Sequence, residues 1–260
     1  MKLRFASLGS GSSGNATVVA CGEQALMIDC GFSLKETEAR LNLLGMCPSE
    51  LKAVLVTHEH GDHAKGVAAL ARKYGTPVYM SRGTALEGKF SVSNALNLIA
   101  SEQEFNIAGF SVVPVTVPHD AREPLQFVVS FGGLTLGVLT DLGSYTPAVI
   151  NAYSGCDALL IEANHDLDLL ANGPYPPSLQ RRVASAWGHL NNQQTVELLQ
   201  NLDLANTQHL VIGHISQKNN SLERVQQALL GLVHTDASLT FASQDMGFGW
   251  IQLDSRQVIA

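Results

Sequence analysis

Short apolar runs separated by glycine-containing turns characterise the beginning of the chain. Runs rich in valine, isoleucine and leucine occupy Leu3–Leu8, Thr17–Cys21, Ala25–Asp29 and Ala53–Val56, and a shorter one follows at Val78–Met80. Apolar runs of this length, bounded by turn residues, are typical of β-strands. The chain is therefore predicted to start as a β-sheet.

Two segments among these strands have the apolar spacing of helices. One covers Leu34–Leu44 and ends before Gly45, and the other covers Ala64–Tyr74 and ends before Gly75. Glycine directly after the last periodic residue is a common helix stop, because it adopts the left-handed conformation without strain. We expect a helix over each segment.

The rest of the chain alternates in the same way. Further strands are predicted at Phe110–Val117, Phe127–Phe131, Leu134–Leu139, Ala158–Glu162, His209–Ile212 and Leu239–Ala242, the last of which closes the chain. Gly132 and Gly133 join two of them as a two-residue hairpin. Helices are predicted after Tyr145, near Pro177–Ala186 and Asn191–Asn201, and at Leu222–Leu232.

This alternation indicates an α/β fold. Strands and helices follow one another in both halves, with no Pro- or Ser-rich linker and no sequence repeat between them. Such a pattern favours an αββα sandwich, in which two mixed β-sheets pack face to face and helices cover both outer faces. We expect residues 1–260 to form one domain, and 45% apolar residues are enough to fill its core.

Composition indicates where in the cell the protein is expected. The N-terminal residues contain no apolar stretch long enough for a signal peptide, and no window approaches the roughly 20 apolar residues of a membrane span. The four cysteines lack CxxC spacing, so we expect free thiols and no thiolate zinc site. These features predict a cytoplasmic protein without a membrane partner, and none of them specifies an oligomeric state.

The net charge of −7 argues against a protein that coats nucleic acid by charge alone. It remains compatible with a phosphate-containing substrate at a local site, where bound cations offset the acidic residues. Charge therefore leaves the substrate open.

A dense cluster of metal-ligand residues follows the strand predicted at Ala53–Val56. His58, His60, Asp62 and His63 fall within six residues, although the whole chain has nine histidines. Imidazole and carboxylate donors suit Zn, Mn or Fe, whereas the competing interpretation is a set of helix caps on a polar loop. One loop cannot easily wrap four donors around a single ion, so we expect two divalent ions. His58 and His60 would bind one ion, and Asp62 and His63 the other.

Three more donors follow predicted strands. His119 comes after the strand ending at Val117, Asp141 after Leu139, and His214 after Ile212. Each alone is weak evidence, since a strand-end aspartate is usually a cap or turn residue. Together with the cluster, they complete a plausible set of ligands.

In this order the residues resemble the metallo-β-lactamase superfamily, whose motifs are Asp, then HxHxDH, then His, Asp and His. The resemblance covers nearly the whole chain and implies the αββα fold. It implies that Asp29 orients ligands without binding metal, that His119 completes the first metal site and His214 the second, and that Asp141 bridges the two ions. We expect zinc, with manganese or iron as alternatives.

Other stretches resemble the YycJ/VicX (WalJ) hydrolases, relatives of phosphodiesterases and tRNA 3′-processing nucleases. They are SLGSGSSGN from Ser7, IEANHD from Ile161, YPPSLQRR from Tyr175 and GHLNN from Gly188. The resemblance implies that His189 is a general acid, while the competing interpretation is a surface histidine beside a helix.

Four further residues are candidate substrate contacts. Ser12 and Asn15 belong to a Gly/Ser-rich loop that could cradle an anion or simply form a tight turn under the metal site. Arg181 and Arg182 could contact a phosphate backbone, although an arginine pair on a helix is more often a solvated face. No motif includes the remaining histidines, which we interpret as structural: His165, His209 and His234.

These features predict a metal-dependent hydrolase. Two ions about 3.5 to 4 Å apart would lower the pKa of a bridging water and supply a hydroxide nucleophile, with Asp62 helping to orient the water. His189 would protonate the leaving alkoxide of a phosphodiester, which we expect in DNA or RNA, with activity like that of a 5′-3′ exonuclease. The alternatives are a thioester hydrolase of the glyoxalase II type and a non-catalytic, metal-stabilised regulatory protein.

Overall fold

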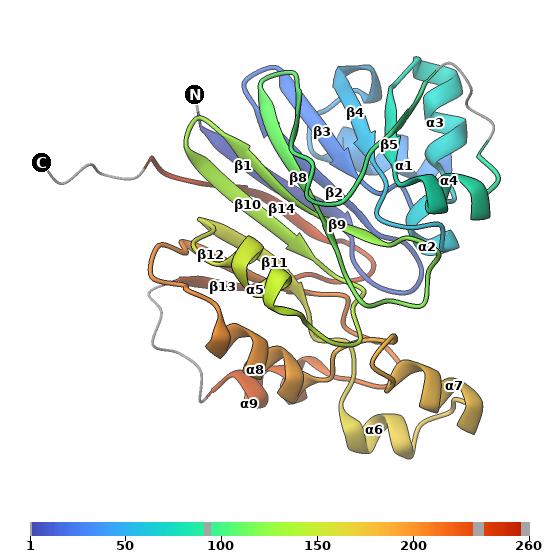
Figure 1. Cartoon of the computed structure of the whole chain (residues 1–260), viewed down its shortest axis with the longest axis vertical. Coiled ribbons are helices and arrows are strands. Elements are labelled where there is room, and N and C mark those ends of the chain that lie inside the picture. Colours follow the sequence, from blue (N-terminus) through green and yellow to red (C-terminus); the bar gives the residue numbers. More distant parts are fainter. Residues whose placement is uncertain (1, 91–94, 231–236, 256–260) are drawn as a thin grey trace, which may run out of the picture.

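A computed structural model describes residues 2–90, 95–230 and 237–255 of the chain. Two sheets of seven strands pack face to face, and helices cover their outer faces (Figure 1). The predicted αββα arrangement is confirmed. No helix in these three described stretches is long and apolar enough to cross a membrane.

The first sheet contains mostly N-terminal strands. Its order is β14 (Phe248–Gln252), β1 (Leu3–Gly9), β2 (Ala16–Cys21), β3 (Gln24–Ile28), β4 (Leu51–Leu55), β5 (Val78–Met80) and β6 (Leu96–Leu98). The pairs from β14 to β3 are antiparallel, and those from β3 to β6 are parallel. The helical elements between these strands are α1 (Leu34–Leu43), η1 (Pro48–Glu50), α2 (Gly61–Ala64), α3 (Val67–Tyr74) and α4 (Arg82–Glu87).

The second sheet has the same sequence of pairings. Its order is β7 (Phe105–Ile107), β8 (Phe110–Thr116), β9 (Leu125–Phe131), β10 (Leu134–Leu139), β11 (Ala158–Glu162), β12 (His209–Gly213) and β13 (Ser238–Phe241). The pairs from β7 to β10 are antiparallel, and those from β10 to β13 are parallel. Its helices are α5 (Pro147–Tyr153), α6 (Leu167–Ala171), α7 (Pro177–Val183), α8 (Asn192–Asn201) and α9 (Leu222–Leu229).

Three apolar clusters fill the spaces between the layers. The central one contains Phe5 and Leu55 of the first sheet against Phe110, Phe127 and Leu160 of the second. A second cluster packs α1 and α3 on the first sheet, and a third packs α5, α8 and α9 on the other sheet. Alternate side chains of each strand therefore enter different clusters, which fixes the register because a slip of one residue would exchange the two faces.

The parallel strands bring their carboxyl ends to one end of the sandwich. Asp29 follows β3, Asp141 follows β10 and His214 follows β12, and each has a positive φ, at 61°, 57° and 49° respectively. Left-handed backbone is costly for residues other than glycine, and such strain gathers at functional sites. At each of these strand ends the chain turns sharply, and a polar side chain lies at the turn.

Several predicted boundaries differ from the structure for identifiable reasons. The helix expected over Ala64–Tyr74 is divided, and α3 begins only after Gly66, whose N–H donates to the Cys30 carbonyl at 2.7 Å. A Cβ at Gly66 would lie 2.3 Å from the Phe32 carbonyl oxygen, so this close approach requires glycine. The helix expected to reach Ala186 ends at Val183, because the following segment turns back toward Gly143.

Six elements in the described part of the chain were not predicted: η1, α4, β6, β7, α6 and β14. The prediction that Leu239–Ala242 is the last strand is wrong, because β14 follows it and pairs with β1. The end of the helix predicted over Leu222–Leu232 lies outside the described residues, as does His234.

Candidate functional site

Three imidazoles form the first group of potential metal ligands. His58 and His60 follow β4, and His119 follows β8. One ring nitrogen from each lies within 4.8 Å of the others, and His58 Nε2 is 3.0 Å from His60 Nδ1. Ring nitrogens that converge in this way present their lone pairs to a common point, as in a site for a divalent cation.

Asp62, His63 and His214 form the second group, with donor atoms within the same 4.8 Å limit. Asp141 lies beside this group: its Oδ2 is 3.3 Å from His63 Nε2, and its Oδ1 is 3.2 Å from His214 Nδ1. Asp141 also comes within 4.8 Å of His58 and His63 together. The structure thus brings all seven predicted ligands together in two adjoining groups, with Asp141 between them.

Asp29 lies behind the ligands. Its Oδ1 accepts the Thr57 N–H at 2.8 Å, and its Oδ2 accepts the Thr57 hydroxyl and the His63 Nδ1–H, each at 2.8 Å. Because the carboxylate holds Nδ1, His63 presents Nε2 to the site. This geometry is that of a carboxylate that orients a ligand histidine.

His119 is oriented by a backbone carbonyl. Its Nδ1 lies 3.0 Å from the oxygen of Gly188, and since a carbonyl can only accept, Nδ1 carries the proton. Nε2 is then the unprotonated nitrogen that faces the first group. His58 has a comparable support in the Thr57 hydroxyl, 2.9 Å from its Nδ1.

The Gly/Ser-rich loop braces the ligands from the other side. The Asn15 N–H donates to the Asp62 carbonyl at 2.8 Å, and Asn15 Nδ2 lies 3.1 Å from His63 Nε2. Ser10 Oγ accepts the His214 N–H at 2.8 Å. A Cβ at Gly31 would lie 1.7 Å from the Asp62 carbonyl oxygen, so the strand end and the ligand turn are in direct backbone contact.

His189 is paired with a carboxylate that the sequence analysis did not single out. Its Nδ1 lies 3.0 Å from Glu162 Oε2, and Glu162 is completely buried at the end of β11. The other oxygen, Oε1, accepts the N–H groups of Leu142 at 2.9 Å and Leu190 at 3.1 Å. A signal was present, because Glu162 ends an apolar run just as Asp29 does.

Burial and neighbouring charge set the protonation of the site. Burial lowers the pKa of His119 to about 4 and the pKa of His58 well below its ordinary value. Burial also acts to lower the pKa values of His63 and His214, but neighbouring carboxylates outweigh it. Asp141 and Asp29 raise the pKa of His63 well above its usual range, and Asp141 and Glu162 raise that of His214 to about 10. In the metal-free protein these two histidines hold protons that a bound cation would displace.

Three buried atoms test whether cations fit. His119 Nε2, Asp141 Oδ2 and His214 Nδ1 have no hydrogen-bond partner within the described part of the chain. Buried polar atoms are normally satisfied, so orphaned atoms that converge on one place indicate a missing ligand. Two groups of imidazole and carboxylate donors with these free positions suit divalent transition-metal ions.

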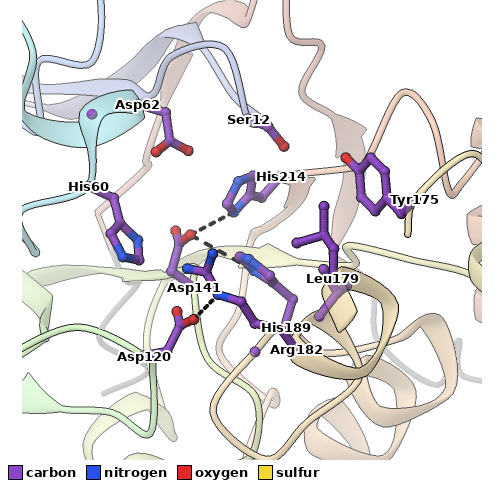
Figure 2. A pocket seen from close by; sticks show the side chains of 13 residues that line it. Ser12, His60, Asp62, Asp120, Asp141, Tyr175, Leu179, Arg182, His189 and His214 are labelled. Atoms are coloured by element: carbon purple, nitrogen blue, oxygen red, sulfur yellow. Dashed lines mark hydrogen bonds and ion pairs between the residues drawn. The ribbon is translucent and has the colours of Figure 1, made fainter. Parts of the chain in front are cut away.

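A cavity of about 370 Å³ opens beside the two groups. His60, Asp62, Asp141, His189 and His214 line one side of it, and Ser12 reaches its edge (Figure 2). Tyr175 and three residues of α7 also line it: Leu179, Arg182 and Val183. Tyr175 and Leu179 lie across the cavity from His60, whereas the head group of Arg182 reaches Asp120 (Figure 2).

The four predicted substrate contacts fall in different places. Ser12 and Arg182 line the cavity, and Arg182 forms an ion pair with Asp120, the neighbour of His119. Asn15 and Arg181 do not line it: Asn15 contacts His63, and Arg181 is exposed on α7. Neither His165 nor His209 lines the cavity.

Comparison with known proteins agrees with this geometry. The model of the β-lactamase superfamily domain matches residues 24–215. The chain is 33% identical over 237 residues to the exodeoxyribonuclease YycJ of Bacillus anthracis, covering 88% of each protein. It is 31% identical over 256 residues to the exodeoxyribonuclease WalJ of Streptococcus pneumoniae, covering 95% of this chain and 91% of that one.

Among solved structures, the metallo-β-lactamase fold protein YhfI from Bacillus subtilis superimposes with a TM-score of 0.73 at 18% sequence identity. The alignment covers 96% of this chain and 99% of YhfI. At this level of identity the likeness shows a shared fold, and it includes both sheets of the sandwich.

Proposed function

Since this chain belongs to the metallo-β-lactamase superfamily and has exodeoxyribonucleases as relatives over most of its length, we propose that it is a metal-dependent nuclease. Its substrate would be the phosphodiester backbone of DNA, cleaved from a strand end. The observation that carries the proposal is His189, which is paired with buried Glu162 and lines the same cavity as four of the predicted ligands: His60, Asp62, Asp141 and His214.

The two ligand groups would each hold a divalent ion. Zinc is the metal that we expect first, because the donors are imidazoles and carboxylates. His58, His60 and His119 would hold one; Asp62, His63 and His214 would hold the other, with Asp141 between them. When bound, the ions would supply Lewis-acid stabilisation of the phosphoryl oxygens and activate a water.

His189 is placed to act as a general acid. Its Nδ1 faces Glu162, so its other ring nitrogen, Nε2, remains for a substrate in the cavity. Burial acts to raise the pKa of Glu162, but His189 and His214 hold it at about 2, so an ionised carboxylate faces His189 Nδ1. Protonation of the departing sugar oxygen by Nε2 avoids release of an unstable alkoxide.

This need for an acid favours a phosphodiester over the alternatives. A thioester releases a thiolate, which is stable without protonation, so thioester hydrolysis has less use for a histidine–carboxylate pair in this position. A non-catalytic, metal-stabilised protein needs neither the pair nor the open cavity beside it. His189 therefore favours a nuclease over a thioester hydrolase and over a non-catalytic protein.

The test is hydrolysis by protein loaded in turn with Zn and Mn. Substrates are a chromogenic phosphodiester, a thioester, and end-labelled single- and double-stranded DNA and RNA. We expect DNA to be shortened from an end, and His189→Ala to keep both metals but to slow turnover by roughly 10² to 10⁴.

His60→Ala, which removes one imidazole from the first group, should instead lose metal and activity together. Metal loss in the His189→Ala protein would contradict the role of general acid. Turnover of the thioester alone would reject phosphodiester hydrolysis, and hydrolysis of none of these substrates would favour the non-catalytic alternative.

A further inference from the structure

The wall of the cavity opposite the ligands has a different chemical character. Figure 2 shows Tyr175 and Leu179 on the far side of the cavity from His60 and Asp62. We call the residues Tyr175, Leu179, Arg182 and Val183 the α7 wall. It offers an aromatic ring, two aliphatic side chains and one guanidinium, none of which is a metal ligand.

Core packing does not explain the α7 wall. No residue of α7 is buried, and Tyr175 in the preceding loop is only half-buried. Leu179, Arg182 and Val183 are spaced i, i+3 and i+4 on the helix, which places them on one face. That face looks into the cavity, so these apolar side chains are available to a ligand.

Tyr175 stands on an unusually stiff segment. Proline occupies both neighbouring positions and the next one, in the order Pro174, Tyr175, Pro176, Pro177. Proline fixes its own φ and restricts the residue before it, so Tyr175 loses little conformational freedom on binding. A rigid aromatic ring beside a reactive centre is a low-cost surface for stacking a planar group.

The charge around the ring suits a nucleotide. The Lys218 ammonium lies 5.7 Å from the centre of the Tyr175 ring, and Arg182 lines the same wall. The chain as a whole carries a net charge of −7, so long-range attraction for a nucleic acid is weak. Local contacts to one nucleotide must then supply a large share of the affinity.

The cavity is of a suitable size for a single nucleotide. Its volume of about 370 Å³ lies at the small end of ligand sites. A base that stacks on Tyr175 inside the cavity has left the neighbouring base, as happens in enzymes that act on flipped or single-stranded bases.

We propose that the α7 wall is a nucleobase subsite, in which the base next to the scissile phosphate stacks on Tyr175 and contacts Leu179. This subsite rests on the proposed nuclease function. It implies that the substrate is a DNA end whose terminal nucleotide is unstacked. Arg182 is within the same wall and can contact an adjacent phosphate, while the ligand groups bind the scissile one.

The experiment is a double-mutant-type cycle. One change removes the aromatic ring of Tyr175, and the other removes the base from the end of the substrate. Wild-type protein, Tyr175→Ala, Tyr175→Leu and Tyr175→Phe are compared on single-stranded oligonucleotides that carry either a base or an abasic residue at the degraded end. We expect Tyr175→Ala to lower kcat/KM about tenfold on the substrate with a base and less than about threefold on the abasic one. Tyr175→Phe should restore most of the loss, and Tyr175→Leu should not.

Duplex ends provide the second arm. An end frayed by terminal mismatches should be degraded faster than a paired end, since unstacking has already taken place. Tyr74→Ala, a tyrosine on α3 outside the cavity, is the matched aromatic control.

An equal loss on both oligonucleotides, or none on either, would overturn the subsite. So would recovery in the Tyr175→Leu protein, which keeps an apolar side chain without a π-face. If the wild-type protein cleaves no phosphodiester at all, it is the nuclease function that fails, so the two failures are distinguishable.

Discussion

The two sheets of this protein have the same pattern of strand pairing but use it differently. In each, three antiparallel pairs are followed by three parallel pairs, and β3 and β10 occupy the same place in that order. Each of these strands is followed by an aspartate with positive φ, Asp29 at 61° and Asp141 at 57°. Yet Asp29 holds its oxygens behind His63, whereas Asp141 lies between the two ligand groups.

The surroundings of the two carboxylates account for this difference. Burial raises the pKa of Asp29, although His63 and Thr57 partly offset it, and both of its oxygens are hydrogen-bonded. Asp141 Oδ2 lies 3.3 Å from His63 Nε2 but has no hydrogen-bond partner among the described residues. Burial would raise its pKa too, but His214 and His63 hold it well below the usual range. Equivalent places in the two sheets thus leave one carboxylate fully hydrogen-bonded and the other with an oxygen that could bind a cation.

The largest effect is expected from Asp141→Asn. An amide keeps the size of the side chain but lacks the charge that would neutralise two adjacent cations, so metal content should fall and hydrolysis should drop to background. Metal analysis together with phosphodiester turnover measures both. Asp168→Asn, on exposed α6, is the matched control and should retain metal. A metal-replete, active Asp141→Asn protein would remove the distinction between the two aspartates.

Glu162→Gln, a substitution at the end of β11 in the second sheet, should have an intermediate effect. Glutamine still accepts from Leu142 and Leu190 but leaves His189 without a charged partner, so kcat should fall about 10²-fold with metals retained. The wild-type carboxylate, with a pKa of about 2, is charged at every assay pH. Its loss removes the acceptor that orients His189 Nδ1, so the effect should fall on kcat and not on KM.

The control for this variant is Glu197→Gln, an exposed carboxylate on α8. A raised KM with an unchanged kcat in the Glu162→Gln protein would show that Glu162 only shapes the cavity. Loss of metal would instead make Glu162 part of the metal centre, and the assignment of His189 and Glu162 as an acid pair would fail.

Asp29→Asn should have the smallest effect of the three. An asparagine amide can replace the acceptor for Thr57 but presents an N–H group to His63 or to Thr57, which weakens the orientation of His63. Loss of such supporting contacts costs roughly 10- to 100-fold in metal affinity. Activity should therefore return at high metal concentration, as measured by titrating metal into the apoprotein. Activity that stays absent at saturating metal would place Asp29 among the ligands.

Much of the metal centre could be predicted because its chemistry is concentrated in sequence. His58, His60, Asp62 and His63 lie on one turn, and Asp141 ends a strong apolar run. The strands of the central core were predictable for the same reason, since their apolar residues alternate between two buried faces. The two sheets have the same order of antiparallel and parallel pairs, but the sequence contains no matching repeat. Strand pairing depends on the apolar pattern and not on residue identity.

The other wall of the cavity could not be predicted. α7 has no buried residue, so its position depends on the contact between Gly143 and the segment ending at Gly188, where an added Cβ would lie 2.4 Å from a backbone nitrogen. Which arginine faces inward follows from the helix: Arg182 shares a face with Leu179, and Arg181 does not. Glu162 was missed because a single strand-end acid is usually a cap or turn residue.

One peptide unit links two parts of the site that have separate tasks. The Gly188 carbonyl fixes the protonated nitrogen of His119, and the next residue along the chain is His189. Glycine is required there, because a Cβ would lie 2.2 Å from the Val183 carbonyl oxygen. The contact that orients His119 and the residue proposed as the general acid are therefore neighbours on one stretch of backbone. A substitution at Gly188 would reach both sides of the site at once, although it touches neither imidazole directly.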